Sequence, residues 1–344
     1  MDTNFVGNSS ITRVMQPNPS QPNGRLLKKI NSEKDVIHFK TLSPAYKNVQ
    51  SYINELCDLI LGTGNKILNH KYTIKNDTYR RCSDVLDELS NLCDTTELEK
   101  TTASLRFGHI AFRDWYDNMK EKCRNYLDKE LAKEETDEQL KEELLTYLTE
   151  SFGNRTRLDY GTGHELNFIL FTIGLVIVIQ SQSSQEKNLS PEILKKHVKE
   201  HGWDIHALFA HKYLRLCRSV QKKFRLEPAG SRGVYNMDDY QFLPFLFGLA
   251  QLVDAKYICL KNFYDYEQVD MWKSDFIFFE AIDYILKNKR GPFNEHSYTL
   301  WCFTSLGSWA NIYRKVRVKF TEDVLSPFPI AQHLLFGEFI MKWT

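Results

Sequence analysis

The stretch that decides the fold is the apolar run FILFTIGLVIVI at residues 168–179, which contains no charged side chain. A helix needs about 20 apolar residues to cross a bilayer, and this run is 12 residues long. A helix that is apolar on all of its sides lies in the core of a protein. We therefore expect a fully buried helix over 166–179, around which the rest of the chain packs.

The chain on either side of this run is also predicted to be helical. No proline occurs between Pro44 and Pro191, and this stretch is rich in Leu, Glu and Lys. Within it, 137–152 carries one apolar face at helical spacing, formed by Leu140, Leu144, Tyr147 and Leu148. Ser190 followed by Pro191 is typical of a helix start. Because alternation typical of strands is rare, we predict an all-α protein with most helices between 45 and 325.

The composition, net charge and cysteines of the chain limit the classes of protein to which it can belong. Of 344 residues, 42% are hydrophobic and 13% aromatic, which is ample for a sizeable core. Lys and Arg number 45 against 44 Asp and Glu, a net charge of +1, so no global charge favours nucleic acid or a membrane. Seven cysteines without a CxxC pair, and no signal sequence, favour a reducing compartment, the cytoplasm with the nucleus as a further location.

The domain organisation is predicted to be simple. Residues 1–35 are rich in Asn, Ser and Pro and are expected to form a disordered arm. Residues 36–344 are expected to form a single compact helical domain.

A first candidate site precedes the apolar run, in the segment RLDYGTGHE at 157–165. Gly161 and Gly163 allow a ligand to approach the backbone, and the following helix start offers unpaired N–H groups. Thr162 adds a hydroxyl, and Arg157 adds a planar fork that suits phosphate oxygens. The segment therefore suits a phosphate cradle. A helix-capping loop would use similar residues, so both interpretations stay open.

A second candidate site follows a second glycine loop, in the segment EPAGSRGVYNMDD at 227–239. Consecutive carboxylates at Asp238 and Asp239 suit a hard cation with oxygen ligands, and a glycine carbonyl can supply another ligand. The alternative is that both aspartates cap the apolar helix that follows. The sequence does not decide between a metal site and a helix cap.

Five stretches of the chain together resemble one family, the phosphotyrosyl phosphatase activators, which activate type 2A protein phosphatase. They occur in the family's order and cover roughly 45–337, and the low-complexity arm suggests a fungal-type member. The stretches are RFGHIAFRDWY at 106–116, SFGNRTRLDYGTGHELNF at 151–168, LEPAGSRGVYNMDDYQFLPFLFG at 226–248, GPFNEHS at 291–297 and FPIAQHLLFG at 328–337.

The resemblance implies an all-α fold with core, linker and lid subdomains around a deep groove. It also implies two linked activities. One is peptidyl-prolyl cis/trans isomerisation of proline-containing peptides. The other is activation of the type 2A phosphatase catalytic subunit with ATP and magnesium as cofactors, a chaperone-like step. The scaffold subunit and related phosphatases are further implied partners, whereas nucleic acid and membranes are not.

The resemblance also implies roles for particular residues. The family's magnesium contacts fall on the carbonyl of Gly233 and on Asp239. Its nucleotide contacts fall on both the first loop and the C-terminal segment, at Arg157, Thr162, Gly163, Ile330, Ala331 and Gln332, with His333 beside them. The C-terminal residues come only from the resemblance, because nothing else in the sequence indicates them.

Prolyl isomerisation needs no nucleophile, because an enzyme lowers the barrier by binding the twisted amide better than either planar form. Asp159 and Glu227 are candidate polar contacts for the peptide. Tyr235, where the family commonly has Trp, and the aromatic run 240–247 are candidates for the proline pocket. The alternative for Phe242, Phe245 and Phe247 is that they belong to the core. A rival function is a non-catalytic phosphatase-binding chaperone whose isomerase activity is incidental.

Overall fold

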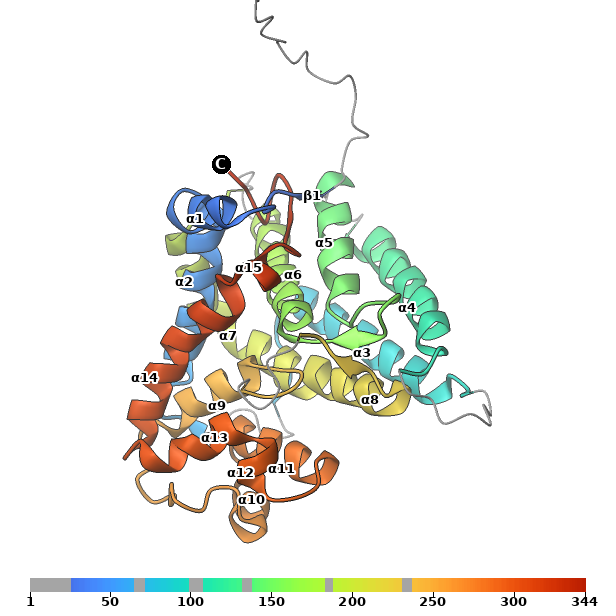
Figure 1. The fold of residues 1–344 in the computed structure, drawn as a ribbon. Coiled ribbons are helices and arrows are strands. Elements are labelled where there is room, and N and C mark those ends of the chain that lie inside the picture. The colour runs from blue at the N-terminus through green and yellow to red at the C-terminus, as the bar shows by residue number, and fades with distance from the viewer. Residues whose placement is uncertain (1–25, 65–71, 99–107, 132–137, 183–187, 231–236) are drawn as a thin grey trace, which may run out of the picture.

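The computed structural model describes residues 26–64, 72–98, 108–131, 138–182, 188–230 and 237–344. Within them the regular secondary structure is helical apart from two pairs of two-residue strands (Figure 1). The α-helices are α1 (Glu33–Thr41), α2 (Pro44–Leu59), α3 (Asp77–Thr95), α4 (Phe112–Tyr126), α5 (Glu138–Glu150), α6 (Thr162–Ser181), α7 (Pro191–Ala207), α8 (Leu214–Phe224), α9 (Leu243–Leu252), α10 (Tyr266–Trp272), α11 (Ile277–Asn288), α12 (Phe293–His296), α13 (Tyr298–Trp301), α14 (Trp309–Phe320) and α15 (Phe328–Ala331). The predicted all-α class is confirmed.

Short helical turns and strands complete the described chain. Wider, π-type turns extend α4 (Leu127–Leu131), join α7 to α8 (Leu208–Tyr213) and follow α14 (Thr321–Leu325), and a 3-10 turn follows α13 (Cys302–Ser305). The strands are β1 (Leu27–Lys28), β2 (Asp159–Tyr160), β3 (Glu227–Pro228) and β4 (Leu335–Phe336). The division into core, linker and lid around a groove stays a prediction.

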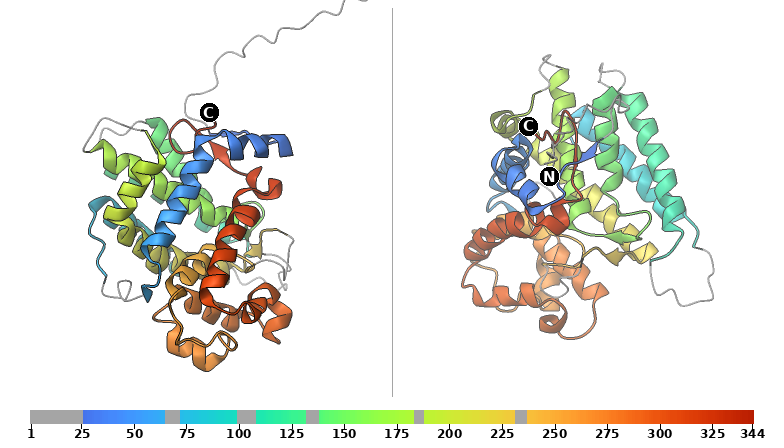
Figure 2. Two further views of the ribbon diagram at one scale, coloured as in Figure 1. Left: turned by 90° about the vertical axis from the view of Figure 1, so that its left-hand side faces the viewer. Right: turned by 45° about the horizontal axis from the view of Figure 1, so that its top comes forward.

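Helix α6 is the buried centre of the fold, as predicted. It packs against α2, α5 and α7, which surround it in Figures 1 and 2. Every residue from Phe168 to Val178 is buried. By length and composition alone α6 is the one helix among the described residues that could cross a membrane, yet 78% of that apolar window is buried inside the fold. The run therefore forms the core of a folded domain.

Local signals account for several helix boundaries. Pro44 and Pro191 each occupy the first turn of a helix, where the missing N–H costs nothing. Ser190 accepts a hydrogen bond from the Ile193 N–H at 3.4 Å, as a helix N-cap does. Helix α5 covers most of the predicted 137–152 and buries the apolar face expected for it. These boundaries depend on residues within one turn.

The two ends of the described chain lie side by side, as Figure 2 shows. Strand β1 pairs antiparallel with β4, with Lys28 opposite Leu335. Ile30 is only 1% exposed, and His38 stacks on Trp343 with ring centroids 4.6 Å apart. The prediction of a disordered arm to residue 35 is therefore wrong for residues 26–35, because β1 pairs with β4, Ile30 is buried and α1 begins at Glu33. Residues 1–25 lie outside the described residues.

Candidate functional site

The two glycine loops that the sequence indicated separately meet in space. Strand β2 pairs in parallel with β3, which places Asp159 in register with Glu227. At Gly161, a Cβ atom would lie 2.8 Å from the Cβ of Ala229, so only glycine permits this approach. A left-handed residue, Arg225 (φ 50°), ends α8 and turns the chain into β3. The first and second loops thus form one composite site at the start of α6.

The first loop carries a compact charged group. Nε of Arg157 lies 2.6 Å from Oδ2 of Asp159, and Nε2 of His164 lies 3.8 Å from Oδ1 of the same carboxylate. Burial acts to raise the pKa of Asp159, but the nearby His164 and the hydrogen bond and positive charge of Arg157 together lower it. Nδ1 of His164 donates to the Glu150 carbonyl at 2.6 Å, which orients the ring. Asp159 is therefore an ionised anchor for two basic side chains.

The C-terminal segment joins this group from the far end of the sequence. A Cβ atom on Gly163 would lie 3.9 Å from Cγ2 of Ile330, so α15 faces the start of α6. Desolvation lowers the pKa of His333, and the positive charges of Arg157, Lys28 and His164 lower it further. The structure thus brings together Arg157, Gly163, Ile330 and His333, which the resemblance had nominated. Lys28 was missed, because no sequence pattern marks it.

Three other predicted nucleotide contacts differ in accessibility. Thr162 is the first residue of α6 and is partly buried, and no side chain caps this helix start. Gln332 is also partly buried, and its Nε2 donates to the Pro329 carbonyl at 3.2 Å. Ala331 is 0% exposed. Any ligand contact at Ala331 must therefore use its backbone.

The second loop carries the predicted metal carboxylate. Oδ2 of Asp239 lies 2.7 Å from Nζ of Lys289, which also donates to the His296 carbonyl at 3.2 Å. Burial raises the pKa of Asp238, and Lys289 opposes that rise. Oδ2 of Asp238 accepts hydrogen bonds from the N–H groups of Tyr240 and Gln241. Asp239 thus already holds a cation, a lysine ammonium, whereas Asp238 stabilises a turn.

The carboxylates of the second loop fit a metal site that is open to phosphate and water, and not one that is enclosed by protein ligands. The described residues contain no group of three or more His, Cys, Asp or Glu that could enclose a metal. Magnesium commonly uses one or two protein carboxylates and completes its shell with phosphates and water. Asp239 fits that second arrangement, because its carboxylate is 32% exposed and is already paired with a cation. Gly233 and Tyr235 lie outside the described residues.

The capping alternative for Asp238 and Asp239 is wrong for α9. That helix begins at Leu243, and the N–H groups of Phe242 and Leu243 donate to Oε2 of Glu165 at 2.8 and 2.9 Å. The cap therefore comes from the first turn of α6, 77 residues earlier. Sequence reasoning missed this role, because a glutamate in a first helical turn looks like an ordinary charged residue.

The predicted peptide contacts divide between surface and core. Glu227 is exposed, whereas Asp159 is buried and engaged with Arg157. Phe242, Phe245 and Phe247 are at most 3% exposed, so the core alternative for them is confirmed. Their rings pack on neighbouring aromatic side chains of the core. None of these three rings is available to line a proline pocket at the surface.

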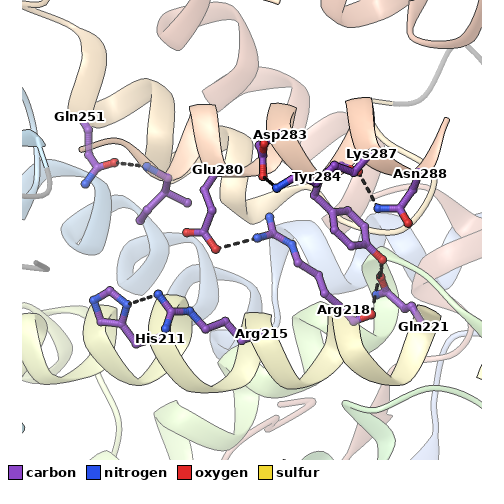
Figure 3. Close-up of polar contacts among 11 residues, drawn as sticks. His211, Arg215, Arg218, Gln221, Gln251, Glu280, Asp283, Tyr284, Lys287 and Asn288 are labelled. Carbon is purple, nitrogen blue, oxygen red and sulfur yellow. Dashed lines mark hydrogen bonds and ion pairs between the residues drawn. The ribbon is translucent and has the colours of Figure 1, made fainter. Parts of the chain in front are cut away.

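A polar network joins α8 to α11 (Figure 3). Nη1 of Arg218 lies 2.9 Å from Oε1 of Glu280, and its guanidinium lies 5.0 Å from the ring centroid of Tyr284. The Tyr284 hydroxyl donates to Oε1 of Gln221 at 3.3 Å. Arg218 is 8% exposed, and its charge acts on both Glu165 and Tyr284. The network therefore holds a buried positive charge near Glu165, in the first turn of α6.

Comparison with known proteins identifies the family of this chain. The chain matches the sequence model of a family described as phosphotyrosyl phosphate activator (PTPA) protein over residues 26–343. It is 36% identical over 300 residues to the serine/threonine-protein phosphatase 2A activator of Drosophila melanogaster, covering 86% of this chain and 68% of that protein. It is 33% identical over 300 residues to activator 2 of Saccharomyces cerevisiae, covering 87% and 78%.

A solved structure has the same fold. The crystal structure of the PP2A phosphatase activator Ypa1 superposes with a TM-score of 0.73 at 25% identity, covering 93% of this chain and 95% of that one. The family match spans nearly all of the described residues, including both loops and the C-terminal segment. The chain therefore belongs to the phosphotyrosyl phosphatase activator family.

Proposed function

We propose that this protein activates the catalytic subunit of a type 2A serine/threonine phosphatase, with ATP and magnesium as cofactors. Relatives named as activators of that phosphatase support the target. The observation that carries the nucleotide assignment is the convergence of Arg157 and Gly163, from the middle of the chain, with His333 from its C-terminal segment. We place the activity in the cytoplasm, with the nucleus as a further location.

The first loop and C-terminal segment would hold the nucleotide. Arg157 is 50% exposed and pairs through Nε, so its terminal nitrogens can reach phosphate oxygens while Asp159 keeps the side chain oriented. The start of α6 offers backbone N–H groups and the positive end of the helix dipole. Thr162 and Gln332 add polar groups at the edge of this cradle, and Ala331 adds only backbone atoms.

The second loop would hold the magnesium ion through the carboxylate of Asp239 and the carbonyl of Gly233. When bound, magnesium supplies positive charge that neutralises phosphate oxygens. Lys289 supplies that charge to Asp239 in the absence of the ion. Asp238 stabilises the turn that follows Asp239 through the N–H groups of Tyr240 and Gln241. We propose that this chain alone binds and positions the nucleotide without hydrolysing it.

The accompanying activity would be peptidyl-prolyl isomerisation. The barrier of about 18–20 kcal/mol arises from amide resonance, and preferential binding of the twisted amide lowers it. Glu227 is exposed beside the buried Asp159, so it is the carboxylate that can contact peptide backbone N–H groups. Tyr235 would contribute the aromatic surface for the proline ring. The peptide would be a proline-containing segment of the phosphatase.

A second candidate is a non-catalytic chaperone that grips the phosphatase, with isomerase activity incidental. One observation favours it: Phe242, Phe245 and Phe247 are in the core, which removes most of the apolar surface expected for a proline pocket. Glu227→Gln separates the candidates. If isomerase activity falls and phosphatase activation falls with it, the isomerase is part of the activation. If activation persists, the chaperone candidate holds.

The experiment that tests the nucleotide assignment compares Arg157→Ala with Arg155→Ala. Both arginines lie in the first loop or directly before it, and each forms an ion pair with an aspartate. Arg157 pairs with Asp159 in the same loop, whereas Arg155 pairs with Asp117 on α4. Hydrogen bonds to charged groups contribute about 1.5–3 kcal/mol, so Arg157→Ala is expected to weaken ATP binding about ten- to a hundred-fold. Calorimetry with the phosphatase catalytic subunit present measures this affinity. Equal affinity for both variants would contradict the assignment.

A further inference from the structure

The second loop is anchored at both of its ends to the same short segment of the first loop. At its start, the N–H groups of Glu227 and Ala229 donate to the carbonyls of Leu158 and Tyr160 at 2.9 and 2.7 Å. At its end, the N–H groups of Phe242 and Leu243 donate to the carboxylate of Glu165. The chain between these anchors carries Asp239. Residues 158–165 therefore hold the chain on both sides of Asp239.

The anchor at Glu165 depends on a single side chain. Glu165 is 1% exposed, and one oxygen, Oε2, accepts both hydrogen bonds. The first N–H groups of a helix have no partner within the helix, so without Glu165 both would be buried and unpaired. Within the described chain, Oε1 has no hydrogen-bond partner. A glutamine at this position could keep both hydrogen bonds through its amide oxygen.

Charged and titratable groups surround this carboxyl group on several sides. Burial raises the pKa of Glu165 to about 8, the backbone hydrogen bonds from Leu243 and Phe242 oppose the rise, Asp238 adds to it and Arg218 opposes it. Tyr160, Tyr213 and Cys217 also interact with Glu165. A buried carboxyl group in this setting acts as a neutral hydrogen-bonding clamp at neutral pH.

We propose that Glu165 is a positioning residue that holds the predicted metal loop at a set distance from the predicted nucleotide loop. The inference rests on the proposed function for the identity of the ligands, magnesium and ATP. The hydrogen bonds of Glu165 on which it is built do not depend on those ligands. Glu165 touches no ligand in this account. It acts through the backbone of Phe242 and Leu243, three and four residues after Asp239. Loss of the clamp should therefore affect the magnesium requirement more than the binding of nucleotide alone.

The test compares Glu165→Ala and Glu165→Gln in the full-length chain, with Asp204→Ala as the matched control. Asp204 is also a buried carboxylate, 3% exposed, that accepts two backbone hydrogen bonds, from Lys75 and Asn76. Its hydrogen-bond partners all lie in 72–76, before α3. Calorimetry of ATP binding across a magnesium titration, with the phosphatase present, measures the magnesium requirement directly. Thermal unfolding of each variant measures its stability.

We expect Glu165→Ala to raise the half-saturating magnesium concentration about fivefold or more, since an unpaired buried group costs at least about that factor. Glu165→Gln should restore it to within about threefold because both hydrogen bonds survive. Asp204→Ala should lower the melting temperature and leave the magnesium requirement unchanged. The proposal is overturned if Glu165→Ala matches the unmodified protein while Asp239→Ala does not, or if Asp204→Ala has the same effect as Glu165→Ala.

Failure of the proposed function would look different. If Asp239→Ala leaves the magnesium requirement unchanged, the metal assignment is wrong, and amide hydrogen exchange then tests the clamp by itself. Glu165→Ala should speed exchange over 237–243 and leave 227–229 protected, whereas unchanged exchange would overturn the clamp as well. If Glu165→Ala does not fold, Glu165→Asp replaces it, because its side chain is one methylene shorter and cannot reach both N–H groups in the same backbone position.

Discussion

Replacement of Lys289 by methionine should make the predicted magnesium site bind its ion more tightly. In the structure the Lys289 ammonium lies 2.7 Å from Oδ2 of Asp239, so an incoming cation must displace it. Methionine keeps most of the apolar stem and removes only the charge. The half-saturating magnesium concentration for ATP binding should therefore fall.

The size of this effect follows from the exposure of the pair. At 2.7 Å, two unit charges attract by about 1.5 kcal/mol in a water-like dielectric, and by about 6 kcal/mol at an effective dielectric of 20. The side chains of Lys289 and Asp239 are 18% and 32% exposed, so water and salt screen the pair. Measured exposed pairs contribute about 0.2–1 kcal/mol net. We take the upper end, about 1 kcal/mol, which corresponds to a change of about fivefold.

The assay is a magnesium titration of ATP binding with the phosphatase catalytic subunit present. Lys287→Met is the matched control, because Lys287 lies near the same end of α11 and pairs with Asp283 at 2.6 Å. It should leave the magnesium requirement unchanged. A higher magnesium requirement in Lys289→Met would refute the reasoning, since it would mean that Lys289 binds phosphate alongside the ion. No change would mean that Asp239 does not bind the ion.

Three further predictions concern stability. Glu143→Ala should destabilise the fold by about 1–3 kcal/mol or more, because the Glu143 carboxylate accepts hydrogen bonds from the N–H groups of Glu338, Phe339 and Ile340. Urea unfolding measures this loss, and an unchanged midpoint would contradict the prediction. Glu165 has a pKa of about 8 in the folded chain, so it keeps a proton that the unfolded chain releases above pH about 4.5. This group therefore lowers the free energy of unfolding as the pH rises from 4.5 to 8. Glu165→Gln should flatten that slope, and a pH profile of melting temperature identical to that of the unmodified protein would speak against it. Deletion of residues 1–25 should leave the melting temperature unchanged. Deletion of residues 1–35 should lower the free energy of unfolding by about 1.5–3 kcal/mol or more, since it removes the buried Ile30 and strand β1. Equal stability of the two truncations would show that β1 contributes nothing.

Part of this fold is determined by the sequence alone. The apolar run at 168–179 has no polar face, so α6 had to be buried. Pro191 after Ser190 starts α7, and the periodic face of α5 predicts both its extent and its buried side. These predictions succeed because helix formation, capping and burial of one face depend on residues within a few turns.

The residues of the candidate site were only partly visible in the sequence. The two glycine loops could be nominated from their own composition, because glycine, arginine and aspartate in a loop suit phosphate and metal ligands. The C-terminal segment at 330–333 could be nominated only through the family resemblance. Lys28 and Glu165 were missed, since the first lies in an arm that looked disordered and the second resembles an ordinary first-turn acid.

Tertiary structure alone decided how these parts meet. The pairing of Asp159 with Glu227, the approach of Ile330 to Gly163 and the bonds from Glu165 to the start of α9 each join residues at least 68 positions apart. Such contacts depend on how α6 packs among α2, α5 and α7, and the free energy of that packing is spread over the whole core. A local pattern specifies which backbone a segment adopts, but only the packed core specifies which segments become neighbours.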